Sequence, residues 1–103
     1  MSIIYISSDH TVTLTGLSGG GSYLNAATVT YALKDLAGTT VSGGTGTLSY
    51  TAASNGNYTG IIDATVTALL TDGGMYYVHA TIVEGGYNDF RKLMLIAKYR
   101  DAS

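Results

Sequence analysis

Histidine, carboxylate and serine side chains could do chemistry in this chain, but their spacing argues against a metal or catalytic site. His10 and His79 are the only histidines. A metal site needs three or four converging ligands, and neither histidine has a second histidine or a carboxylate at ligand spacing. Cysteine is absent, so no thiolate is available as nucleophile or ligand. We therefore expect no metal and no cofactor, and we interpret both histidines as solvated or interface residues.

The other candidate motifs also lack the context that their chemistry requires. No serine stands in a G-x-S-x-G nucleophile elbow. The glycine clusters at 19–21 and 43–44 lack the following helix and lysine of a phosphate loop. The aspartates fall at predicted turns or termini, where they act as turn formers: Asp9, Asp35, Asp63, Asp72, Asp89 and Asp101. We expect a protein that is not an enzyme.

Strands must position whatever these residues do, because no segment has a convincing helical pattern. Thr, Val, Ile and Tyr dominate, and glycine pairs recur at intervals of roughly ten residues, which is typical of an all-β sandwich or barrel. We predict one domain over residues 1–103, with about seven to nine antiparallel strands. The predicted strands cover 3–7, 10–17, 28–34, 39–42, part of 43–52, 58–62, 75–84 and 90–99.

The connections between these strands are less uniform. Residues 18–27 are predicted to form a flexible loop, and Asn55-Gly56 is a strong hairpin signal ahead of an inward-facing Tyr58. Residues 63–69 fit a strand, a loop or one helical turn. In the last strand we expect Leu93, Leu95, Ala97 and Tyr99 to face the core.

One spacing identifies the architecture. Leu70, Gly73, Tyr76 and Val78 form the pattern L-x-x-G-x-x-Y-x-V, which resembles the tyrosine corner of immunoglobulin-like sandwiches. In that motif a tyrosine near a strand start hydrogen-bonds back across the preceding turn. The cysteines and tryptophan of antibody domains are absent. The resemblance is therefore to disulfide-free immunoglobulin-like modules of bacteria and phages, and it implies an immunoglobulin-like antiparallel β-sandwich.

Two further stretches, IIYISSDHTVTLTGL and SNGNYTGII, fit the same group. Taken with the strand order, they resemble small immunoglobulin-like proteins of tailed-phage virions. The resemblance implies a virion protein made in the host cytoplasm: a capsid decoration or cement protein, or a component of the head–tail region or tail. It also implies major capsid or connector proteins as partners, and several copies or a homo-oligomer on a symmetric assembly.

Charge and hydropathy fit a chain that packs against other proteins. The formal net charge is −2 and charged residues make up 12% of the chain, which is low for a surface exposed to water on all sides. Nucleic acid is therefore an unlikely partner, and no run is long enough for a membrane helix. Four of the five basic residues fall between Arg91 and Arg100. An acidic partner and protection of an edge strand both explain this cluster.

Apolar residues at outward positions indicate an interaction surface. Tyr77, His79 and Val83 alternate away from the predicted core in one strand, and Met94 and Ile96 do so in the last strand. Ile4 and Ile6 of the first strand either extend this patch or cover it. Contiguous apolar patches usually mark interaction sites, although burial within the monomer is the alternative.

A second class of function remains open from the loops. Tyr23 and Tyr87 stand in the glycine-rich stretches SGGGSYLN and EGGYND. Exposed tyrosines in loops at the end of a sandwich are typical of an adhesin or a carbohydrate-binding module.

Overall fold

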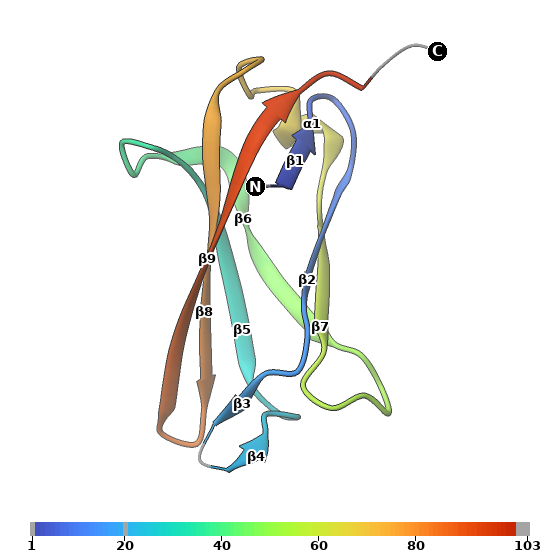
Figure 1. Ribbon diagram of the computed structural model, residues 1–103, viewed down its shortest axis with the longest axis vertical. Coiled ribbons are helices and arrows are strands. Elements are labelled where there is room, and N and C mark those ends of the chain that lie inside the picture. Colours follow the sequence, from blue (N-terminus) through green and yellow to red (C-terminus); the bar gives the residue numbers. More distant parts are fainter. Residues whose placement is uncertain (1, 20, 101–103) are drawn as a thin grey trace.

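Strands make up nearly all of the regular structure in the computed structural model, which describes residues 2–19 and 21–100. The predicted all-β fold is confirmed, with strands arranged as a sandwich, and the nine strands found among these residues fall within the expected range (Figure 1). The strands are β1 (Ser2–Tyr5), β2 (His10–Leu14), β3 (Ser18–Gly19), β4 (Ser22–Tyr23), β5 (Thr28–Asp35), β6 (Thr40–Tyr50), β7 (Tyr58–Ile62), β8 (Met75–Glu84) and β9 (Tyr87–Lys98). The helix α1 (Ala64–Thr67) is one turn long.

The strands form two layers that share β6. The order is β1-β9-β8-β5-β6-β7-β2, with β9, β8 and β5 on one side and β7 and β2 on the other (Figure 1). β6 pairs with β5 along most of its length and then with β7 at Ser49 and Tyr50. Its register shifts near Gly43, which has φ +74°, a value that favours glycine. The two separate strands predicted over 39–52 are therefore one bent strand.

β1 is the exception to the predicted antiparallel arrangement. It runs parallel to β9, from Ser2 beside Leu95 to Tyr5 beside Lys98, whereas the other strand pairs are antiparallel. β1 therefore points alternate side chains into the space between the layers. Ile4 and Ile6 are 0% and 3% exposed. The expectation that they extend an exposed patch is wrong.

The predicted tyrosine corner is present. The hydroxyl of Tyr76 accepts a hydrogen bond from the backbone N–H of Thr71 at 2.9 Å, across the turn that precedes β8. Gly73 supplies the left-handed conformation of this turn with φ +80°. Leu70 and Val78 are buried on either side of it. The buried phenol thus satisfies a turn N–H that has no strand partner, and it sets the point at which β8 enters the core.

Tyr58 holds the opposite end of the sandwich. Its buried hydroxyl donates to the carbonyl of Leu24 at 2.6 Å and accepts from the N–H of Ala27 at 2.9 Å. The neighbouring Asn-Gly pair does not form a two-residue hairpin, because residues 51–57 separate β6 from β7. Gly56 instead packs on the chain near Leu17, whose N–H donates to the Gly56 carbonyl at 2.9 Å.

The segment that the sequence left open between strand, loop and helical turn is the single turn α1. Asp63 is its N-cap, and a carboxylate oxygen of Asp9 accepts from the N–H of Ala64 at 2.8 Å. The fully buried hydroxyl of Thr67 donates to the Ser8 carbonyl at 2.8 Å. α1 therefore ties the loop after β1 to the end of the sandwich.

Two further expectations need correction. The stretch predicted as a flexible loop contains the β3–β4 hairpin, although Gly20 lies outside the described residues. Leu93 and Tyr99 are 37% and 62% exposed rather than buried, because β1 covers β9 only from Leu95 onwards and β9 ends at Lys98. The core consists of Ile4, Ile6, Val12, Leu14, Leu17, Leu24, Val29, Tyr31, Leu33, Leu48, Tyr58, Ile62, Val66, Leu70, Tyr76, Val78, Ala80, Ile82, Leu95 and Ala97.

Candidate docking face

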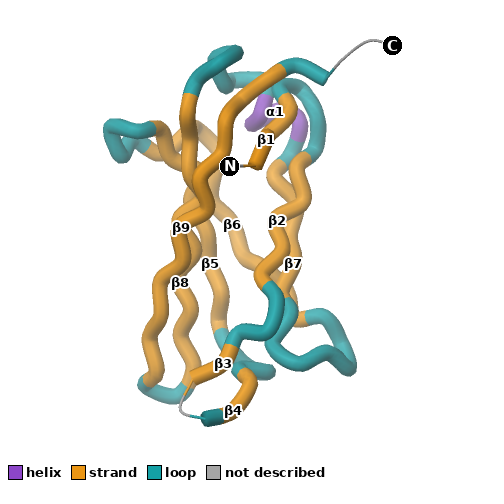
Figure 2. Tube along the Cα trace, in the orientation of Figure 1, coloured by secondary structure: helices purple, strands orange, loops and turns teal. Residues whose placement is uncertain are grey.

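The outward side chains of β1, β9, β8 and β5 form one surface, which we call the docking face. These strands lie side by side in Figure 2, and their register aligns the side chains in rows. Ile3 lies beside Ile96, which lies opposite Met75, and Met94 lies opposite Tyr77 in the next row. The apolar and aromatic members are Ile3, Tyr5, Met75, Tyr77, His79, Val83, Phe90, Met94 and Ile96, each exposed or half-buried.

Five predicted interface residues lie on this face: Tyr77, His79, Val83, Met94 and Ile96. Their role as an interface stays a prediction. The face also contains four residues that were not predicted as part of an interface: Ile3, Tyr5, Met75 and Phe90, of which Phe90 is 49% exposed. Strand alternation carried the signal, because Phe90 shares the outward phase of Met94. Phe90 was predicted to be the first residue of the last strand, so its outward position was overlooked. β9 in fact begins three residues earlier, at Tyr87.

An aromatic cluster occupies the middle of the docking face. The rings of His79 and Phe90 meet edge to face, with centroids 3.7 Å apart, and the Tyr77 ring lies 6.5 Å from that of His79. The Lys92 ammonium lies 4.2 Å from the centroid of the Tyr77 ring, within cation–π range. Desolvation, followed by the charges of Lys34 and Lys92, lowers the pKa of His79 below its ordinary value of 6.5. The uncharged imidazole is therefore favoured at neutral pH.

The docking face is cationic. In the strand register Lys34 lies opposite Tyr77, Lys92 opposite His79 and Lys98 beside Tyr5. The Arg100 guanidinium lies 4.1 Å from the Tyr5 ring centroid. No Asp or Glu occupies an outward register position of β1, β5, β8 or β9 within the described residues. This surface is therefore apolar and positively charged.

Arg91 does not belong to the docking face. Its Nε lies 3.0 Å from a carboxylate oxygen of Asp89, the only ion pair within residues 2–19 and 21–100. Arg91 lies opposite the buried Ala80, which places it on the inner side of β9. The basic cluster of the sequence thus divides between two sides of one strand.

A groove opens between the layers beside Ser2, where β1 begins. It has a volume of about 270 Å³, and its lining includes Val12, Leu93, Leu95 and His10. On one side of this groove lies β2, the edge strand of the sheet. On the other side lies the part of β9 that precedes Leu95, which has no pairing with β1. Burial lowers the pKa of His10 below its ordinary value of 6.5. The groove exposes strand edges and one core-facing leucine.

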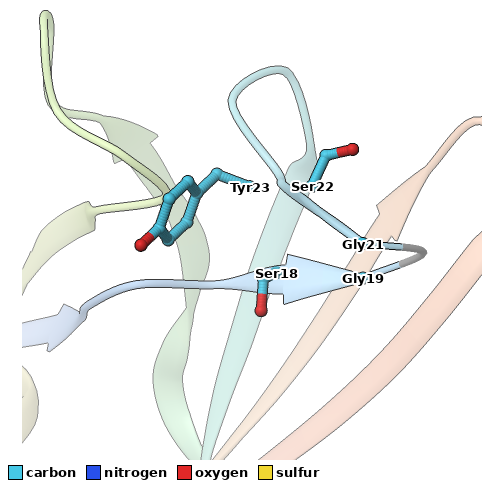
Figure 3. Close-up of a pocket in the computed structure, with 5 residues that line it drawn as sticks. All are labelled: Ser18, Gly19, Gly21, Ser22 and Tyr23. Carbon is cyan, nitrogen blue, oxygen red and sulfur yellow. The ribbon is translucent and has the colours of Figure 1, made fainter.

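The β3–β4 hairpin carries a shallow pocket of about 400 Å³ (Figure 3). Tyr23 is 51% exposed there, but the hydroxyls of Ser18, Ser22 and Tyr23 point in different directions. Tyr87 packs its ring against Gly19, so closely that a Cβ at this glycine would overlap the ring. The predicted sugar-contacting pair is therefore divided between an exposed tyrosine and one that packs on the hairpin.

The described part of the chain contains neither a cluster of metal ligands nor a membrane-spanning helix. Within 2–19 and 21–100, no group of three or more His, Cys, Asp or Glu side chains could hold a metal ion. No helix in the same ranges has the length and apolar character to cross a membrane.

Comparison of the chain with models of protein families, with curated proteins and with solved structures found no match.

Proposed function

We propose that this chain is a non-enzymatic structural protein of a tailed-phage virion, held in the capsid shell or the head–tail region through the docking face. The observation that carries the proposal is the row of apolar and aromatic side chains across β1, β9 and β8. Surfaces of this kind usually mark protein interaction sites. The resemblance to small immunoglobulin-like virion proteins supports the virion as the location of the protein, with synthesis in the host cytoplasm.

The docking face combines the features of an interface centre. Tyr77 and Phe90 offer large rings with few rotatable bonds, so their burial against a partner costs little side-chain entropy. Met94 can adapt to an irregular surface because its side chain is unbranched. All three project from paired strands and not from loops, so the face is organised before a partner arrives. The partners proposed are capsid or connector subunits and further copies of the chain.

Purified particles of the phage that encodes this chain provide the test. Quantitative mass spectrometry should find the chain in many copies per particle. Tyr77→Asp and Met94→Asp should reduce incorporation at least tenfold, about the effect of losing one interface anchor. The matched control is Ile61→Asp, since Ile61 is 62% exposed on the opposite layer. Particles that lack the chain, or that take up all three variants equally, would refute the proposal.

Carbohydrate binding is the second candidate, favoured by the exposed Tyr23 beside the hairpin pocket. A glycan array should then give a signal that Tyr23→Ala removes, because sugar rings stack on exposed aromatic faces. A silent parent protein would dispose of this candidate and leave the first intact.

A further inference from the structure

Charge is unevenly divided over this molecule. Lys34, Lys92, Lys98 and Arg100 give the docking face four of the five basic residues of the chain. Seven acidic residues and the one remaining base, Arg91, leave a formal charge of −6 for everything else. No carboxylate lies within ion-pair distance of those four cations among residues 2–19 and 21–100. The face therefore presents uncompensated positive charge to whatever covers it.

This distribution disfavours a two-fold dimer through the docking face. A two-fold dimer through the docking face would bring the four cations of one copy into the same interface as the four of the other. Like charges brought together across an interface cost several kcal/mol when they are not neutralised. The complementary occupant is a surface that supplies carboxylates together with an apolar contact.

The chain itself carries such a surface at the end of the sandwich next to α1. We call it the α1 end and define it by Asp9, Asp63, Leu69 and Asp72, all exposed. The loop after β1, the helix and the turn before β8 gather there, at the top of Figure 1. Leu69 is 59% exposed, so an apolar side chain accompanies the three carboxylates. The docking face and the α1 end are thus complementary in charge and in hydrophobicity.

We propose that the docking face is occupied by the α1 end of a second copy of this chain. The inference rests on the proposed function, and it names the neighbour that the docking face meets in a virion assembly. A contact between two different surfaces of identical chains is head-to-tail, so it propagates into a ring or a filament according to the rotation between copies. Each added copy presents a new face and a new end.

The purified chain alone tests this arrangement. Light scattering and sedimentation velocity should show assembly that grows with protein concentration. Between about 50 mM and 500 mM NaCl the association constant should fall on the order of tenfold, because exposed ion pairs are screened. The face variant Lys34→Glu/Lys92→Glu and the end variant Leu69→Asn/Asp72→Asn should each be folded monomers. Ile61→Asp, on the opposite layer, should assemble as the parent does.

Mixing the two variants is the decisive step. The face variant keeps an intact end, and the end variant keeps an intact face, so one good contact forms between them. Because both remaining surfaces are defective, growth stops and the mixture should yield a 1:1 heterodimer. A mixture that stays monomeric, or an end variant that assembles normally, overturns the proposal.

A parent chain that is monomeric at every concentration and salt also overturns it. That result leaves the proposed function standing if Tyr77→Asp still loses incorporation into particles, since the face then binds a foreign subunit. If every variant is incorporated and the free parent still assembles, the head-to-tail contact stands and the proposed function falls.

Discussion

Replacing Tyr76 with phenylalanine removes one oxygen atom and one hydrogen bond. The ring stays in the core, so the apolar area that it buries is almost unchanged. The loss falls on the Thr71 N–H, which donates to the Tyr76 hydroxyl at 2.9 Å in a partly buried turn. An amide left without a partner there costs about 1–2 kcal/mol. For a domain of this length, that corresponds to a fall in Tm of roughly 5–12 °C.

Tyr77→Phe is the matched control. It removes the same atom one residue later, from a ring on the docking face whose hydroxyl makes no hydrogen bond within the described residues. Urea unfolding followed by far-UV circular dichroism should show a lower midpoint for Tyr76→Phe with an unchanged m-value. The control should stay within about 0.5 kcal/mol of the parent. Equal midpoints for the two variants would refute the role given to the tyrosine corner.

Three further predictions address the opposite end and the pH response. Tyr58→Phe should cost about 2–3 kcal/mol, more than Tyr76→Phe, because two backbone partners, one buried and one half-buried, lose the hydroxyl; urea unfolding checks the order. Gly56→Ala should destabilise by at least about 1 kcal/mol, because φ is +72° and a Cβ would overlap the Leu17 backbone; an unchanged midpoint contradicts this close packing. Burial lowers the pKa of His10 in the folded chain, so the unfolded chain binds more protons just below pH 6.5. The free energy of unfolding should therefore fall as pH drops through that window, and His10→Gln should flatten the fall measured by urea unfolding across pH.

Much of the docking face follows from strand alternation. Tyr77 and His79, together with Met94, are placed outside the core by a period of two that any strand imposes. Ile4 and Ile6 could not be placed this way, because the first strand is apolar on both sides. Its parallel pairing with β9 decides which side faces inward, and that pairing joins segments more than ninety residues apart.

Local features of this protein were predictable from the sequence: the strands at 58–62 and 75–84, the tyrosine corner and, within residues 2–19 and 21–100, the absence of a long helix. These depend on alternation and on turn residues, which act within about ten positions of each other. Three other features could not be predicted from the sequence: β6 serves both layers, Phe90 meets His79, and the cations gather on one face. Each of those outcomes depends on which distant strands pair and in which register. A shift of one residue in that register would turn every side chain of a strand to the opposite side.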